Sequence, residues 1–167
     1  KNFNLALGDS GVIPGLMVFP AARIRGVDVD HWSDNKNVRW TGFHGREQAG
    51  ILGTLTPGVV SKRTLNSYLS GGILDYKLND NARFKTGYFS ASGKSRSDDL
   101  NRTGEGVEGE VKLGSHMKFN TETDFNNEHF AQRHALTTTF DKLRVRNEVR
   151  DISKKFFTMI GAPSRQG

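Results

Sequence analysis

The chain has 167 residues, of which 35% are hydrophobic and 25% are charged, a composition that indicates a folded protein rather than a disordered one. It contains no cysteine, which excludes disulfide scaffolds, thiolate zinc sites and cysteine nucleophiles. A formal net charge of +6 favours acidic partners such as nucleic acid in a general way, without marking a site. The length suits a single domain, residues 1–167.

No apolar run approaches the roughly 20 residues that a membrane helix needs. The best local stretch, residues 12–22, is interrupted by Pro14, Gly15 and Pro20, so we expect no membrane span. The glycine-rich segment 50–58 lacks the pattern of a phosphate-binding loop or a dinucleotide site. We therefore expect no small-molecule cofactor.

Alternating or short apolar segments predict strands at residues 3–7, 16–19, 24–29, 38–43 and 51–55. The clearest signal covers residues 73–90, where Leu74 and Tyr76 alternate with polar residues, residues 79–81 form a turn, and Phe84 and Tyr88 alternate again. This pattern predicts a β-hairpin. Residues 91–106 are rich in Ser, Gly and charged residues and predict an exposed loop. Residues 108–113 alternate as a further strand, and residues 117–123 continue or pair with it.

The tetrapeptide at residues 114–117, Gly-Ser-His-Met, matches a sequence commonly left by tag removal and vector cloning. It is either a chance occurrence in a natural loop or an engineered seam. A seam would join segments 1–113 and 117–167 by fusion or circular permutation, so that their order in the chain would not be their biological order.

The apolar period changes near residue 141. Val145, Val149, Ile152 and Phe156 fall on one helical face, and Gly161 and Pro163 supply stop signals. We therefore predict an amphipathic C-terminal helix over residues 141–160. The expected fold class is β-rich (α+β): a mostly antiparallel sheet, folded as a sandwich or small barrel, with this one helix.

One motif suggests catalysis. Asp99, followed by Glu110-Val111-Lys112 on a strand, resembles the core of the PD-(D/E)xK nucleases. The resemblance implies Asp99 and Glu110 as magnesium ligands and Lys112 as the residue that polarises the attacking water. It covers about fifteen residues; no proline precedes the aspartate, and Asp99 follows no apolar strand. Alternating charges are also typical of a solvent-facing strand edge.

Histidines offer no metal site, because the five-residue spacing of His129 and His134 places them on opposite faces of a strand. Basic residues interleaved with aromatic ones can bind nucleic acid by stacking and phosphate neutralisation. The alternative for these residues is core packing around the tryptophan and a solvated outer helix face. The candidates are Arg39, Trp40, Arg46, Arg144, Arg146, Arg150, Lys154 and Lys155.

Three functional classes follow. We favour a non-catalytic structural or assembly protein, such as a viral or phage particle component, that self-associates through strand edges or the terminal helix. The second class is a basic nucleic-acid-binding module. The third is a magnesium-dependent nuclease that uses Asp99, Glu110 and Lys112.

Overall fold

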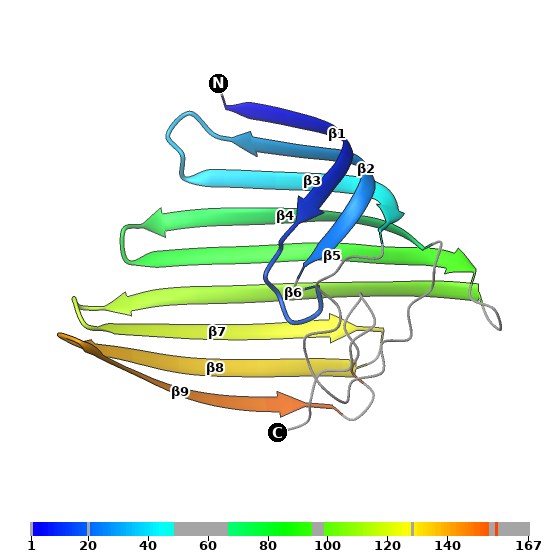
Figure 1. Ribbon diagram of the computed structural model, residues 1–167. Helices are drawn as coiled ribbons and strands as arrows, with labels where there is room; N and C mark the ends of the chain where they lie inside the picture. The colour runs from blue at the N-terminus through cyan, green and yellow to red at the C-terminus, as the bar shows by residue number, and fades with distance from the viewer. Residues whose placement is uncertain are drawn as a thin grey trace.

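The structure, a computed structural model, describes residues 2–19, 21–48, 67–94, 99–127, 129–153 and 156. These residues form one antiparallel sheet in which every strand pairs with its neighbours in the sequence, so the spatial order is the chain order (Figure 1). The strands are β1 (Phe3–Val12), β2 (Ala22–Trp32), β3 (Val38–Glu47), β4 (Tyr68–Asn79), β5 (Ala82–Lys94), β6 (Asp99–Leu113), β7 (Met117–Asn126), β8 (His129–Phe140) and β9 (Leu143–Ile152).

The sheet is open within the described part of the chain. β1 and β9 are its two edges, and no described strand pairs with the outer side of either. The predicted antiparallel, β-rich class is confirmed, but the described strands form one sheet rather than a sandwich or a closed structure. The reason is that a connecting segment, not a second sheet, covers part of the inner side (Figure 1).

The predicted C-terminal helix is wrong over the described residues. β9 pairs with β8 from Ala131↔Ile152 to Phe140↔Leu143, which makes residues 143–152 a strand. Val145 and Val149 are four residues apart, a spacing that puts them on one side of a helix and equally on one side of a strand. Pairing with β8 decides between the two. Residues 154–155 and 157–160 lie outside the described part of the chain. Among the described residues, no helix is long and apolar enough to cross a membrane.

Other local predictions had mixed outcomes. The predicted hairpin is β4 and β5, although both strands extend beyond residues 73–90. The predicted loop 91–106 is wrong where it is described, because residues 91–94 are strand and pair with residues 99–102, and residues 103–106 are strand and pair with residues 87–90. Residues 16–19 form no strand, the predicted strand 51–55 lies outside the described residues, and residues 114–116 form the tight turn between β6 and β7.

Short turns at residues 33–37, 80–81, 114–116 and 141–142 lie at one end of the sheet, which we call the turn end (Figure 1). The opposite end, which contains the connection 13–21, is the loop end. The hydrophobic core lies on the inner side near the loop end. It consists of Val12, Leu16, Val18, Phe19, Ile24, Phe43, Leu69, Phe89, Ala91, Ala131 and Phe156.

Candidate functional site: a two-faced sheet with a buried carboxyl pair

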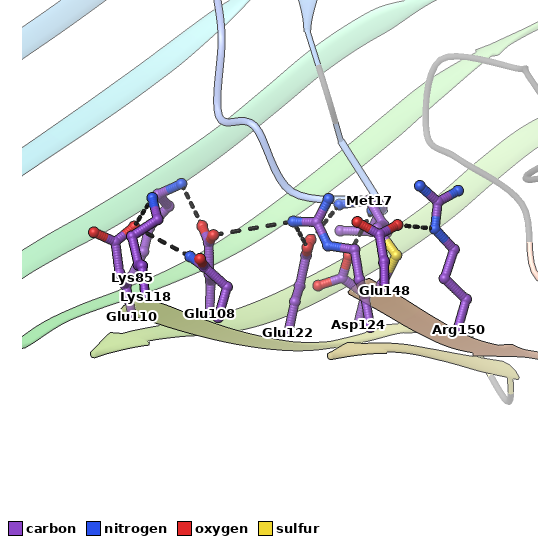
Figure 2. Close-up of polar contacts among 12 residues, drawn as sticks. Met17, Lys85, Glu108, Glu110, Lys118, Glu122, Asp124, Glu148 and Arg150 are labelled. Atoms are coloured by element: carbon purple, nitrogen blue, oxygen red, sulfur yellow. Dashed lines mark hydrogen bonds and ion pairs between the residues drawn. The ribbon is translucent and has the colours of Figure 1, made fainter. Parts of the chain in front are cut away.

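Ion pairs between neighbouring strands cross the inner side of the sheet, which we call the charged face. Arg39 Nε lies 2.7 Å from Asp30 Oδ1, so β3 is tied to β2. Lys85 Nζ lies 2.7 Å from Glu108 Oε2, so β5 is tied to β6. Opposite charges on adjacent strands stabilise this register over its alternatives. The series continues with Arg83–Asp75 and Arg133–Glu122. It also includes Lys118–Glu110, which lies beside Lys85 and Glu108 (Figure 2).

A hollow of about 250 Å³ opens on this face between residues 13–14 of the connection and strands β1 to β5. Its charged lining residues are Asp28, Asp30, Arg39, Asp75, Arg83 and Lys85. Burial raises the pKa of Asp30, but hydrogen bonds from Arg39 and Thr41 outweigh burial and hold the pKa below its ordinary value. Asp30 is therefore ionised at neutral pH, and the hollow carries both signs of charge.

Two carboxyl groups on β7 are fully buried under the connection 13–21. Glu122 and Asp124 are 1% and 0% exposed, and alternation along the strand puts them on the same face. Glu122 Oε1 accepts a hydrogen bond from the Met17 backbone N–H at 2.5 Å, and Asp124 Oδ2 accepts one from Val18 at 2.7 Å (Figure 2). These two bonds attach the connection to a strand more than a hundred residues away in the sequence.

The two carboxyl groups cannot both ionise at low cost. Burial, followed by the charge of Glu122, raises the pKa of Asp124 to about 8. Burial also raises the pKa of Glu122, although the Met17 hydrogen bond and the nearby Arg133 guanidinium oppose that rise. At neutral pH we assign the proton of the pair to Asp124, whose Oδ1 accepts no hydrogen bond among the described residues.

Aromatic packing fixes the rest of the connection. The Phe19 ring stacks on Phe89 with centroids 4.7 Å apart and contacts Phe43 at 5.4 Å. Gly71 and Gly87 leave room for these rings, because a Cβ at either position would lie 2.5–2.6 Å from a Phe89 ring carbon. Leu16, Val18 and Phe19 of the connection are therefore part of the hydrophobic core.

The outer side of the sheet is apolar and exposed, and we call it the apolar face. Nearly all of the large hydrophobic side chains that belong to strands and are exposed lie on this face, as the strand register shows. Trp32 is the exception. The members of the apolar face include Phe3, Leu5, Leu7, Trp40, Tyr68, Leu74, Tyr76, Phe84, Tyr88, Val107, Val111, Leu113, Met117, Phe119, Phe125, Phe130, Phe140, Leu143, Val145 and Val149.

Charge is confined to one end of the apolar face. Among strand residues whose side chains the structure describes, every charged residue that shares this face lies toward the loop end. The polar residues nearer the turn end include asparagine, threonine and histidine, and His134 Nδ1 lies 2.9 Å from Thr121 Oγ1. The charged residues are Asp9, Arg23, Arg25, Arg46, Glu105 and Asp151.

The structure does not bring the three nuclease candidates together. Asp99 is the first residue of β6 and Glu110 is eleven positions along the same strand, about 36 Å away at roughly 3.3 Å per residue. Glu110 and Lys112 do share the charged face, as alternation predicts. However, Glu110 binds Lys118 and Asn120, and Lys112 Nζ binds the Asp80 carbonyl oxygen. These contacts place both residues in the network of the charged face.

The nucleic-acid candidates are divided between the two faces. Arg39 lies on the charged face, where Asp30 neutralises it and its guanidinium stacks 5.1 Å from the Trp32 ring. Trp40 and Arg46 lie on the apolar face. Arg144, Arg146 and Arg150 lie on the charged face of β9, which five strands separate from β3. Lys154 and Lys155 fall outside the described residues.

The described side chains include no group of three or more His, Asp or Glu residues placed to hold a metal ion. No family model, no curated protein and no solved structure matches this chain.

Sequence reasoning missed the buried pair and the two-faced character of the sheet. The alternation of apolar and polar residues within each strand indicated two different faces. The relative register of the nine strands was needed to show that the apolar sides of all strands lie on the same face of the sheet.

Proposed function

We propose that this chain forms a wall between lipid and water: the apolar face contacts the acyl chains of a membrane, and the charged face lines an aqueous space. The observation that carries the proposal is the separation of the two faces over all nine strands. Such an alternation, apolar outside and polar inside, is typical of strands that cross a membrane. The sequence expectation of no membrane span considered helices alone.

The apolar face has the height that lipid requires. On β8, every second residue from Phe130 to Phe140 lies on this face, namely Phe130, Gln132, His134, Leu136, Thr138 and Phe140, and none of them is Asp, Glu, Lys or Arg. These ten steps cover about 33 Å along the strand, or about 25 Å when the strand is tilted by about 40°, close to the apolar band of membrane-crossing strands. Tyr68, Tyr88 and Phe125 add aromatic side chains near the charged loop end, where an interface with headgroups would lie.

A water-soluble role fits this face poorly. Large apolar patches on soluble monomers mark binding surfaces, and this one extends from β1 to β9. The charged face, in contrast, keeps its ions solvated or paired, with the hollow beside Asp28 and Arg39 open to polar solutes. Transport of small polar solutes along the charged face is the activity that this arrangement supports best.

The two tryptophans provide a matched test, because Trp40 lies on the apolar face and Trp32 on the charged face. We would refold the single-tryptophan variants Trp32→Phe and Trp40→Phe from urea into phosphatidylcholine vesicles, with and without brominated acyl chains. Bromine quenches tryptophan emission only at close range. We expect strong quenching when Trp40 remains and little quenching when Trp32 remains.

Equal quenching of both tryptophans, or quenching of neither in protein that floats with vesicles, would refute the proposed orientation. A defined assembly that stays in solution without lipid or detergent would favour the structural particle component predicted from the sequence. Co-elution with nucleic acid that high salt removes would favour the nucleic-acid-binding module. Magnesium-dependent cleavage that Glu110→Gln abolishes would support the nuclease.

A further inference from the structure

The inner side of β9 has an excess of positive charge. Arg144, Arg146, Glu148 and Arg150 alternate on the charged face of this edge strand. Glu148 pairs with both Arg146 and Arg150, which leaves Arg144 without an ion pair among the described residues. The inner side of β9 thus carries three arginines and a single carboxylate.

Strand β8 cannot balance this charge. The register places Arg150 opposite Arg133, a like charge that is already paired with Glu122 on β7. Arg146 and Arg144 lie opposite Thr137 and Thr139, which are neutral. Elsewhere on the charged face, the basic residues Arg39, Lys85 and Lys118 each find a carboxylate on an adjacent strand.

We propose that the outer edge of β9 binds an extended acidic strand of another polypeptide, with carboxylates at alternate positions facing the arginines and apolar residues facing outward. An edge strand offers free backbone N–H and C=O groups that a partner strand pairs. The added carboxylates would complete the cross-strand pattern that the other strands already follow.

Charge argues against a second copy of the described edge strands as this partner. A second copy joined edge to edge through β9 would set arginine against arginine, and the charged-face positions of β1 (Asn4, Ala6, Gly8, Ser10 and Val12) carry no carboxylate. Nor does this chain hold a suitable segment of its own outside the described parts. Residues 49–66 and 157–167 contain no Asp or Glu, and residues 95–98 contain only Asp98.

The test uses two labelled ten-residue peptides that alternate valine with glutamate or valine with lysine. Binding to the detergent-solubilised chain is followed by fluorescence anisotropy. We expect the glutamate peptide to bind at least tenfold more tightly than the lysine peptide. The double variant Arg146→Glu with Arg150→Glu should reverse that preference. A variant with Lys36→Glu in the β2–β3 turn serves as the matched control and should keep it.

Reversal of preference is the decisive result, because a variant that merely unfolds would lose both peptides. Equal binding of the two peptides, or an unchanged preference in the double variant, would overturn the proposal. The charge argument does not depend on lipid contact. If lipid bromine fails to quench Trp40 while the double variant still reverses the peptide preference, the membrane proposal is refuted and the proposal for β9 stands.

Discussion

Because Asp124 holds a proton in the folded protein, the free energy of unfolding should fall as the pH rises. The side chain is fully buried and its pKa is raised to about 8, whereas an unfolded chain restores the ordinary value of 3.8. Between these two values the folded state keeps a proton that the unfolded state releases. The free energy of unfolding therefore falls through this range, the opposite of the behaviour of a carboxylate stabilised by a salt bridge.

The size of the effect follows from the same two values. A difference of roughly four pH units, at about 1.4 kcal/mol each, corresponds to a loss of about 6 kcal/mol between pH 4 and pH 8. Asp124→Asn removes the titration, keeps the size of the side chain and leaves an oxygen to accept the Val18 hydrogen bond. We expect the variant to be more stable than the parent protein at pH 8.

The assay is urea unfolding in detergent micelles between pH 4 and pH 9, followed by tryptophan emission. Asp80→Asn is the control, because Asp80 is exposed and its hydrogen bond with Lys77 lowers the pKa. That variant should keep the steep pH dependence of the parent. If Asp124→Asn also keeps it, or if the parent is equally stable at pH 5 and pH 8, the assignment of the proton to Asp124 is wrong.

Three further predictions concern packing and lipid contact. Gly106→Ala should cost about 1–3 kcal/mol, because its Cβ would lie 2.2 Å from Asp124 Oδ1, while Gly109→Ala, with its nearest atom at 3.5 Å, should cost far less in the same urea assay. Phe89→Ala should lower the unfolding free energy by about 3–5 kcal/mol, since the ring is 0% exposed; a change below 1 kcal/mol would show that Phe89 is not a core residue. Val107→Arg should reduce the yield of vesicle-inserted protein at a cost of about 2–4 kcal/mol, and insertion as efficient as that of Val107→Ala would argue against lipid contact.

Local sequence was sufficient where a strand and its partner lie side by side in the chain. The hairpin of β4 and β5 was predictable, because Leu74, Tyr76, Phe84 and Tyr88 alternate around a turn. The same alternation placed Glu110 and Lys112 on one face. Residues 91–94 and 99–106 were misjudged because glycine and serine carry no apolar signal. Pairing between β5 and β6, and of β6 with β7, stabilises these residues as strand.

By itself, the sequence determined that this protein is built from antiparallel strands, since period-two alternation is a local property of each segment. Only the tertiary structure decided that residues 143–152 form β9, because Val145 and Val149 satisfy both the helical and the strand spacing until β8 supplies hydrogen bonds. It alone placed Met17 on Glu122, a contact across 105 residues. Such contacts depend on the register of several strands at once, and no local pattern specifies that register.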